Sequence, residues 1–375
     1  MNRERPYPSA SAPQTRLAAA ACLERLAVED IERACRGATP YAAVQAIARR
    51  LAQDEATHGN VWLVKTSPGT STAQAASAGE IAIAPRNISA WPLWFRQGPG
   101  RFEVPLLYLL RCESVAGLRA AMYETADRGI LCNDAETTAS RWPKGVQPAV
   151  PLWLAGGLDG VPYDPASGQE ALAILRAALQ TLYVDNKPGF FYLTLHDDDG
   201  NVPRPSRADV HDAYKGMYRI TAAIRPDVPV IRLLGAGKAL GQVIQAADLL
   251  QEDWGAACEV WSCPSYTRLA REAYEVERWN MLHPLSDKKA SHLQRCLGPG
   301  QPPVLAVTGY GQHVAEQIGG FVPARFIALG ADSHRAANGP RGVHWIVAAA
   351  LKALCDEGSL PTRRAEEALK RYALV

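Results

Sequence analysis

The chain has 375 residues, 47% of them hydrophobic, which is enough for packed cores and excludes a disordered chain. Its 40 basic and 38 acidic residues leave a net charge of +2, which excludes a strongly basic nucleic-acid binder. No run of apolar residues is long enough to predict a membrane span, and the N-terminus lacks the apolar segment of a secretory signal. The eight cysteines include no CxxC pair, so we expect a cytoplasmic protein with free, buried thiols.

Helix and strand signals alternate along the first half of the chain, after a Pro- and Ser-rich tail. Thr39-Pro40 predicts a helix start, because threonine caps the first turn and proline fits the first helical position. Ser167-x-x-Glu170 predicts another start, as a capping box. We expect helices at 16–36, 40–58, 114–128 and from 167 onward, and strands at 61–64, 104–110, 130–132 and 190–195.

The stretch 66–100 differs, because it is rich in Gly, Pro and Ser and predicts mostly loop. Its aromatic residues Trp91, Trp94 and Phe95 predict a packing cluster beneath that loop. A ligand site is the alternative interpretation of these three residues.

Strands and helices alternate without a break in the C-terminal third. The expected strands are 229–234, 257–262, 303–307 and 325–329, and the expected helices are 238–251, 312–319 and 343–356. This alternation predicts a parallel sheet covered by helices. The sequence therefore predicts two α/β domains, 38–195 and 210–375, joined by a polar, Pro-rich linker at 196–209 and preceded by a tail and helix at 1–37.

Two glycine motifs invite a cofactor interpretation. Gly235-Ala-Gly237 follows an apolar strand, as in dinucleotide-binding folds, but the next glycine, Gly241, comes one position late for the fingerprint. Gly157-Leu-Asp-Gly160 with Asn186 mimics the magnesium motif of thiamine enzymes, which needs a contiguous Gly-Asp-Gly. For both motifs the alternative is a tight turn in which glycine lets the backbone approach closely.

Residues 278–284, Arg-Trp-Asn-Met-Leu-His-Pro, combine a cation, an indole, an amide and an imidazole. We interpret them as a buried network at a domain or subunit contact, with catalysis by His283 as the alternative. His313, His334 and His344 are too widely spaced to predict a metal site. Neither a Gly-x-Ser-x-Gly elbow nor a P-loop supports a hydrolase or NTPase.

Several strings of the C-terminal half resemble one known family. They are VERWNMLHPL (276–285), FFYLTLHDDDGNVPRP (190–205), RLLGAGKALGQVIQAADLL (232–250) and TGYGQHVAEQIGGFVPARFIALGADSHR (308–335). In order and spacing they are similar to the last two domains of the single-chain pyruvate dehydrogenase decarboxylase component, a transketolase-like thiamine diphosphate enzyme of many bacteria. The resemblance covers residues 160 to 375 well and residues 38–159 less closely.

The resemblance implies two three-layer α/β domains, a pyrimidine-binding domain followed by a transketolase C-terminal-like domain. It also implies thiamine diphosphate with magnesium as the cofactor. The family's diphosphate-binding domain, with its Gly-Asp-Gly and Asn metal motif, has no counterpart in this sequence. The chain thus resembles a β-type subunit, and a separate α-type chain is expected to hold the diphosphate and most of the magnesium contacts. Because the family's domains pack in pairs, we also expect self-association through the α/β domains.

One catalytic residue is carried over from the resemblance. The family's cofactor-activating glutamate precedes the strand that corresponds to 104–110, and Glu80 matches its place as both catalytic and cofactor-binding residue. Two features depart from the family. Residues 111–115 hold no aromatic platform for the pyrimidine, and residues 138–163 hold no histidine, leaving Arg141 and Lys144 as the cations there.

Three functions remain as hypotheses. The first is a β-type subunit that decarboxylates a 2-oxo acid or transfers a two-carbon acyl or ketol unit from a 2-oxo acid or ketose-type donor. The second is a catalytically degenerate relative that acts as a scaffold or regulatory subunit. The third, a nucleotide-binding oxidoreductase built on Gly235 to Gly241, has the least support. A neighbouring reading frame with Gly-Asp-Gly followed by Asn would favour the first.

Overall fold

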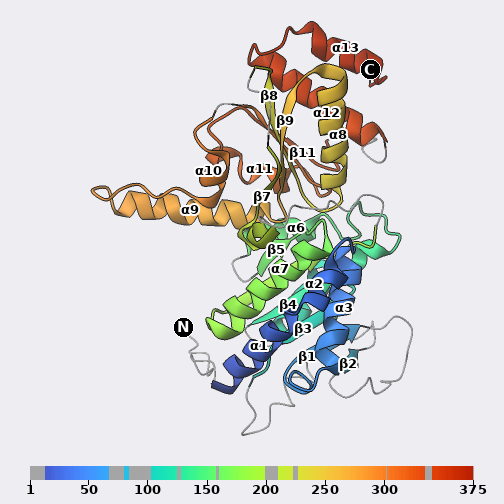
Figure 1. Cartoon of the computed structure of the whole chain (residues 1–375), viewed down its shortest axis with the longest axis vertical. Helices are drawn as coiled ribbons and strands as arrows, with labels where there is room; N and C mark the ends of the chain where they lie inside the picture. The colour runs from blue at the N-terminus through green and yellow to red at the C-terminus, as the bar shows by residue number, and fades with distance from the viewer. Residues whose placement is uncertain are drawn as a thin grey trace.

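The computed structural model describes residues 13–66, 80–83, 103–124, 128–157, 160–198, 210–222, 227–300, 302–333 and 340–374. Figure 1 shows two α/β halves placed end to end along the long axis, the N-terminal half (blue to green) below the C-terminal half (yellow to red). Each half contains one sheet with helices on both faces. This arrangement confirms the predicted α/β fold with two sheet systems.

The first sheet has six parallel strands in the order β2-β1-β3-β4-β6-β5. They are β1 (Trp62–Thr66), β2 (Glu80–Ile83), β3 (Leu106–Leu110), β4 (Arg128–Asn133), β5 (Gly160–Tyr163) and β6 (Gly189–Thr194). β3 is buried along its whole length, as the continuous apolar run 104–110 predicts for a strand covered on both faces.

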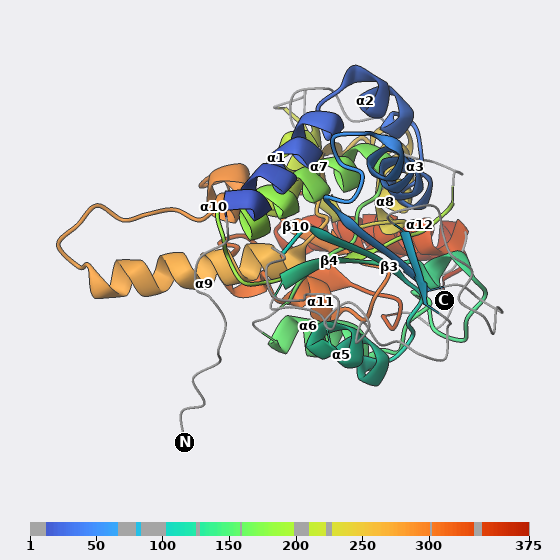
Figure 2. The same cartoon turned by 90° about the horizontal axis from the view of Figure 1, so that it is seen from below.

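Helices on the two faces of this sheet close two separate cores (Figure 2). One face carries α1 (Pro13–Leu26), α2 (Glu29–Cys35), α3 (Pro40–Gln53) and α7 (Gly168–Leu179), and the other carries α5 (Val115–Glu124) and α6 (Ala149–Gly156). Successive residues of β3 alternate between them: Leu107 and Leu109 enter the first core, and Leu106 and Tyr108 the second.

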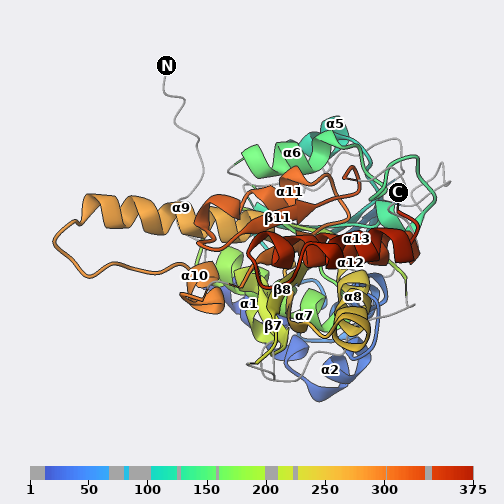
Figure 3. The same cartoon turned by 90° about the horizontal axis from the view of Figure 1, so that it is seen from above.

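The second sheet has five strands in the order β11-β10-β8-β9-β7. They are β7 (Tyr218–Thr221), β8 (Val230–Gly235), β9 (Ala257–Ser262), β10 (Val304–Val307) and β11 (Phe326–Leu329), and β7 alone among them runs antiparallel to its neighbour. Helices α8 (Ala239–Trp254), α12 (Pro340–Asp356) and α13 (Arg363–Arg371) cover one face, and α9 (Tyr266–Leu282), α10 (His292–Leu297) and α11 (His313–Glu316) the other (Figure 3). The short helices are η1 (Ala135–Thr137), η2 (Gln180–Val184), η3 (Val210–Lys215) and η4 (Gly319–Phe321).

The helix starts follow the predicted capping chemistry, with one correction. Thr39 Oγ1 accepts a hydrogen bond from the N–H of Ala42 (3.1 Å) and so caps α3 as expected. The helix expected at 16–36 is instead two helices, α1 and α2, separated at Ala27 and Val28. The acidic residues Glu29 and Asp30 then open a new first turn, where negative charge is favourable.

All eight cysteines are free, and seven of them are buried, which confirms the expected thiols. Within the described ranges, no helix combines the length and apolar character needed to cross a membrane.

Candidate functional site

The candidate site lies where the parallel strands of the first sheet end. Ligands of α/β sheets bind beyond the carboxyl ends of the strands. β4 ends at Asn133, whose amide donates to the Cys112 carbonyl (2.6 Å) and to Tyr192 Oη (2.8 Å). Its oxygen accepts from the N–H groups of Cys112 (3.0 Å) and Ala135 (3.1 Å). Because all four of its hydrogen-bonding positions are used, Asn133 fixes the turn after β4 and is not available to a ligand.

Arg111, which directly follows β3, is held by Asp134, which directly follows β4. Arg111 donates from Nε and Nη2 to the two carboxylate oxygens of Asp134, both at 2.9 Å. These hydrogen bonds raise the pKa of Arg111, so its guanidinium stays charged. This ion pair occupies the position directly after β3, where the resemblance implies an aromatic platform.

A buried ion cluster occupies the same edge nearer to the second domain. Lys144 Nζ lies 2.9 Å from Asp164 Oδ1 and 3.3 Å from Glu136 Oε2, and all three side chains are less than 10% exposed. Burial alone would lower the pKa of Lys144, but the two carboxylates outweigh it and raise that pKa. Lys144 is therefore a charged, fully paired cation rather than a group that can exchange a proton near neutral pH.

The second domain completes this cluster. Lys238, just before α8, lies 3.7 Å from Glu136 Oε1. The ring of Tyr310, which follows β10, lies 5.1 Å from Lys144 Nζ, and its hydroxyl hydrogen-bonds to Thr194 Oγ1 at the end of β6. Two lysines thus balance two carboxylates across the domain junction. Arg141, the other cation expected in this loop, lies over the ring of Trp142 (4.4 Å) instead.

The glycine turn after β8 packs against the same cluster. Gly237 has φ +51°, and a Cβ at this position would lie 2.1 Å from Asp164 Oδ1. Its N–H donates to the backbone carbonyl of Asp164 (3.0 Å). Asp164 therefore lies directly against this turn. The contact supports the alternative of a tight turn, in which glycine allows the two domains to pack closely, over the dinucleotide interpretation of Gly235 to Gly241.

His196 is a buried side chain of this edge, and both of its ring nitrogens lack hydrogen-bond partners within the described chain. It follows β6 and is 3% exposed. Burial lowers its pKa to about 3, and the nearby charges of Lys144 and Lys238 add to that effect. Asp198 and the Pro165 carbonyl oppose the shift without reversing it. The ring is therefore a neutral imidazole at physiological pH.

This pKa predicts a loss of stability in acid. The pKa of His196 is lower in the folded than in the unfolded state, so protons bind the unfolded chain more tightly. The free energy of unfolding is therefore highest above the unfolded pKa of about 6.5 and decreases as the pH falls toward 3. At about 1.4 kcal/mol per pKa unit, and with the unfolded histidine already half protonated at pH 6.5, the loss amounts to roughly 2 kcal/mol between pH 6.5 and 4.5. Urea unfolding at these two pH values should show a smaller difference for His196→Gln than for wild type. His58→Gln, at an exposed histidine, is the control and should behave as wild type; equal differences in all three proteins would contradict the assignment.

The remaining predicted site residues are placed as follows. Glu80 begins β2 and its backbone pairs with Leu63 of β1, while its side chain, like Trp91, Trp94 and Phe95, lies outside what the structure describes. Asn186, with φ +57°, accepts a hydrogen bond from Arg128 (2.7 Å) before the start of β6. The magnesium interpretation of Asn186 is therefore not supported, because metal motifs of this type stand at carboxyl ends of strands.

The histidines do not converge. His283 lies at the exposed end of α9 and stacks on Trp279 (4.3 Å), so the segment 278–284 is not a buried contact between the two domains of this chain, and the alternative of a subunit contact stays a prediction. His344 stacks on Tyr372 (4.2 Å), and His334 lies outside the described residues. In the described ranges no group of three or more His, Cys, Asp or Glu side chains is arranged to hold a metal ion.

Glu170 has a role that its sequence context did not predict. Its N–H donates to Ser167 Oγ (3.3 Å), as expected for a helix cap. Its carboxylate, however, is buried and accepts from Tyr218 Oη (2.6 Å) and Ser262 Oγ (2.7 Å) of the second sheet. Together with the Lys144 cluster it joins the domains through buried charge. The capping signal gave no indication of these distant partners.

Comparisons with known proteins agree with this geometry. A family model of the transketolase-like TK C-terminal domain matches residues 216–336. The pyruvate dehydrogenase E1 component of Cupriavidus necator is 36% identical over 223 residues, which is 57% of this chain and 25% of that protein. The matched stretch thus spans about a quarter of the length of this curated relative.

Solved structures show the same fold at low sequence identity. A transketolase variant from Pichia stipitis gives a TM-score of 0.54 at 15% identity, covering 94% of this chain and 50% of that one. A split-gene transketolase, in an inactive β4 tetramer, gives 0.52 at 15% identity and covers 83% of this chain and 97% of that one. Over 223 residues the chain is therefore similar to about a quarter of the pyruvate dehydrogenase E1 component, and its residues 216–336 match a transketolase-like C-terminal domain.

Proposed function

We propose that this chain is the β-type subunit of a two-chain thiamine diphosphate enzyme. The enzyme decarboxylates a 2-oxo acid or transfers a two-carbon acyl or ketol unit. A separate α-type chain binds the diphosphate and holds most of the magnesium contacts. The β-type chains associate with one another through their α/β domains, and the assembly works in the cytoplasm.

The main support for this proposal is how much of each relative's length this chain matches. The homologous stretch matches only a quarter of an E1 component, while the fold matches nearly the whole chain of a split-gene transketolase. The likeness to the split-gene protein supports an enzyme whose two halves are on different polypeptides. The split-gene protein, inactive as a β4 assembly, gives a precedent for a β chain that depends on a partner.

The described residues fit thiamine diphosphate only in part. The Arg111 and Asp134 pair presents a planar guanidinium of the kind that stacks on rings, which suits a pyrimidine. Asn133 and Lys144, in contrast, are fully occupied by other groups of the protein. The diphosphate and metal contacts are therefore assigned to the partner chain, and Glu80 is proposed as the acid that contacts the aminopyrimidine.

The changed loop after β4 bears on the substrate. In the resembling family this loop supplies histidines beside the reacting carbons, whereas here it supplies the paired Lys144. A permanently charged lysine does not donate and recover a proton near pH 7 as a histidine does. This difference favours a donor other than pyruvate, from the 2-oxo acids or ketoses.

The purified chain alone is expected not to bind thiamine diphosphate tightly. At its described edge the Asn133 amide and the Lys144 ammonium are already paired within the chain, and the sequence has no contiguous Gly-Asp-Gly with a following Asn to hold magnesium. Isothermal titration calorimetry with thiamine diphosphate and magnesium tests this. Micromolar binding without a partner chain would contradict the two-chain proposal, and binding that appears only after the partner is added would support it.

The self-paired cluster favours one alternative, a catalytically degenerate relative. In that case Lys144, Glu136 and Asp164 stabilise the domain junction where the family performs chemistry, and the chain acts as scaffold or regulatory subunit. One measurement distinguishes the two functions: turnover of a panel of 2-oxo acid and ketose donors by the chain reconstituted with its partner. The enzyme subunit should give turnover with at least one donor, and the degenerate relative should give none.

A further inference from the structure

A cavity of about 680 Å³ lies beside β5, the edge strand of the first sheet, and is called the β5 cavity below. It is bounded by α7 and η2, by β5 and the start of β6, and by η3 and the first turn of α9. Its volume falls within the range of small-molecule sites, roughly 300–1,000 Å³. The lining includes none of the candidate-site residues, which are Arg111, Asn133, Lys144 and His196. The β5 cavity is therefore a separate place for a ligand, which the proposed function does not use.

Aromatic side chains contribute to the wall of the β5 cavity on the side of the sheet. The rings of Tyr163 on β5 and Phe191 on β6 are nearly parallel, with centres 5.5 Å apart and 6° between their planes. Tyr163 Oη donates to the carbonyl of Tyr214 on η3 (2.7 Å), and the half-buried Tyr214 also lines the cavity. Rigid aromatic groups of this kind favour a ligand that contains a ring.

Basic side chains without partners also line the β5 cavity. Arg268, in the first turn of α9, is half-buried, while Lys187 and His211 are exposed. Within the described residues, none of these three side chains makes a hydrogen bond or an ion pair. Their donor groups are therefore available to a ligand, and Arg268 is the one that is partly shielded from water.

The acidic side chains near the β5 cavity already have partners. Asp185 Oδ1 accepts from Gln180 Nε2 (2.8 Å), and Glu32 Oε1 lies 3.0 Å from Nη2 of Arg176, which lines the cavity from α7. The lining therefore has an excess of positive charge, and an anion is the complementary ligand. A guanidinium group matches the oxygens of a phosphate in two parallel hydrogen bonds, so Arg268 favours a phosphate in particular.

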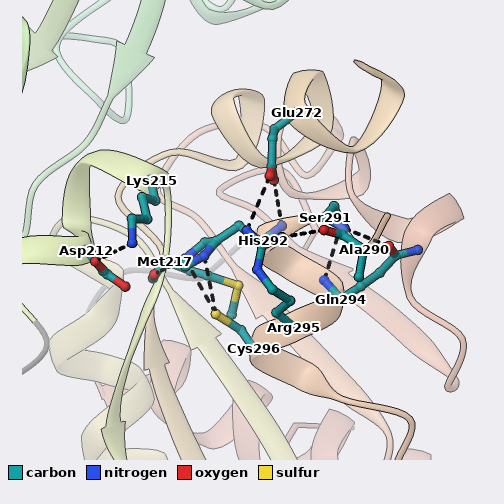
Figure 4. A network of polar contacts seen from close by, with 10 residues as sticks. All are labelled: Asp212, Lys215, Met217, Glu272, Ala290, Ser291, His292, Gln294, Arg295 and Cys296. Atoms are coloured by element: carbon teal, nitrogen blue, oxygen red, sulfur yellow. Dashed lines mark hydrogen bonds and ion pairs between the residues drawn. The ribbon is translucent and has the colours of Figure 1, made fainter. Parts of the chain in front are cut away.

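The elements that carry two of these basic residues are fixed relative to each other, as Figure 4 shows. The N–H of His292, at the start of α10, donates to Glu272 of α9 (2.7 Å), and His292 Nε2 lies 2.9 Å from the carbonyl of Met217, just after η3. One histidine thus joins α9, which carries Arg268, to the segment that carries His211. A cavity whose walls are held in this way loses less entropy when it binds a ligand.

We propose that the β5 cavity binds a mononucleotide. Its base would lie against the aromatic wall, and its phosphate would be held by Arg268, with Lys187 and His211 adding donors and positive charge. The aromatic wall belongs to the first domain and Arg268 to the second, so the bound molecule would contact both domains. The ligand class follows from the combination of rings and unpaired cations, because neither alone selects a phosphorylated ring compound.

Isothermal titration calorimetry of the full chain, without partner chain or thiamine diphosphate, tests the proposal. The probes are the four ribonucleoside monophosphates, with adenosine and inorganic phosphate as controls that lack the phosphate or the ring. At least one monophosphate should bind with a Kd of about 100 μM or tighter. Adenosine and inorganic phosphate should each bind about 10-fold more weakly or not at all, because each makes only one of the two kinds of contact.

Two variants locate the binding. Arg268→Ala should weaken binding of the best monophosphate about 10-fold or more, since it removes the proposed phosphate contact. Lys187→Ala should weaken it about 3-fold, and because this side chain is exposed, the variant should fold even if Arg268→Ala does not. Arg278→Ala, at an exposed arginine farther along α9, is the matched control and should bind as wild type does. Circular dichroism checks that each variant is folded.

Three results would overturn the proposal. The first is that none of the four monophosphates binds more tightly than about 1 mM. The second is that folded Arg268→Ala and Lys187→Ala bind as tightly as wild type, which would place the ligand elsewhere. The third is equal affinity for adenosine and its monophosphate, which would mean that the phosphate makes no contact. Since the experiment contains neither thiamine diphosphate nor a partner chain, none of these results decides the proposed enzyme function.

Discussion

Lys144→Met should lower the free energy of unfolding by about 3–5 kcal/mol, the usual cost of removing one partner from a buried ion pair. The methionine would fill much of the space of the lysine stem, but it would leave Asp164 and Glu136 buried without their shared cation. Burial already raises the pKa of Asp164 although Lys144 opposes it, so the loss of Lys144 should raise it further. Urea unfolding at pH 7, followed by circular dichroism, measures the change.

Two matched variants separate buried charge from general disruption. Lys238→Met removes a lysine that is 38% exposed and 3.7 Å from Glu136, so its cost should stay within about 1 kcal/mol. Lys144→Met combined with Asp164→Asn and Glu136→Gln should recover most of the loss, because the buried charges are then removed together. If Lys144→Met unfolds at the same urea concentration as wild type, the cluster does not stabilise the domain junction.

The sequence predicted best the strands whose own residues are mostly apolar. The run 104–110 contains β3, because a strand buried on both faces is marked by a continuous apolar run with a turn at each end. The run 257–262 is β9, although Glu259 and Ser262 interrupt its apolar residues. The two-sheet architecture followed from the order of such runs. Here the local signal and the tertiary environment agree.

No helix was predicted over the second half of α9, because this half is mostly exposed and lacks the apolar pattern that packing on a core imposes. Ser265 caps α9 by accepting from the Arg268 N–H (3.1 Å), and Leu269, Ala270 and Ala273 follow at helical spacing. This cap and spacing mark a helix start, although no helix was predicted over these residues. The segment 278–284 is mostly exposed within this chain, so it does not join the two domains, and a subunit contact stays a prediction.

The candidate site was only partly predictable for a different reason. Lys144 could be named as a cation of the changed loop, but its partners Glu136 and Asp164 belong to other segments, and Lys238 belongs to the other domain. The pairing depends on how the strand ends meet the second sheet, which no local pattern contains. His196 likewise gave no signal, because its low pKa arises from burial beside those same lysines.

Glu80→Gln should reduce turnover by the reconstituted two-chain enzyme about 100-fold or more, the scale of a lost acid–base group. Glu80 is the sole carboxylate in residues 56–102, so no neighbour in that stretch can replace it, and glutamine keeps the size while removing the acid. Glu55→Gln, at an exposed glutamate after α3, is the control and should retain wild-type turnover. Decarboxylation of a panel of 2-oxo acids by the chain with its α-type partner measures the effect. Equal activity of wild type and Glu80→Gln would show that Glu80 is not the activating acid. A wild-type pair that is inactive on every donor would instead favour the degenerate scaffold, because the paired Lys144 would then stabilise the fold at an edge where no reaction occurs.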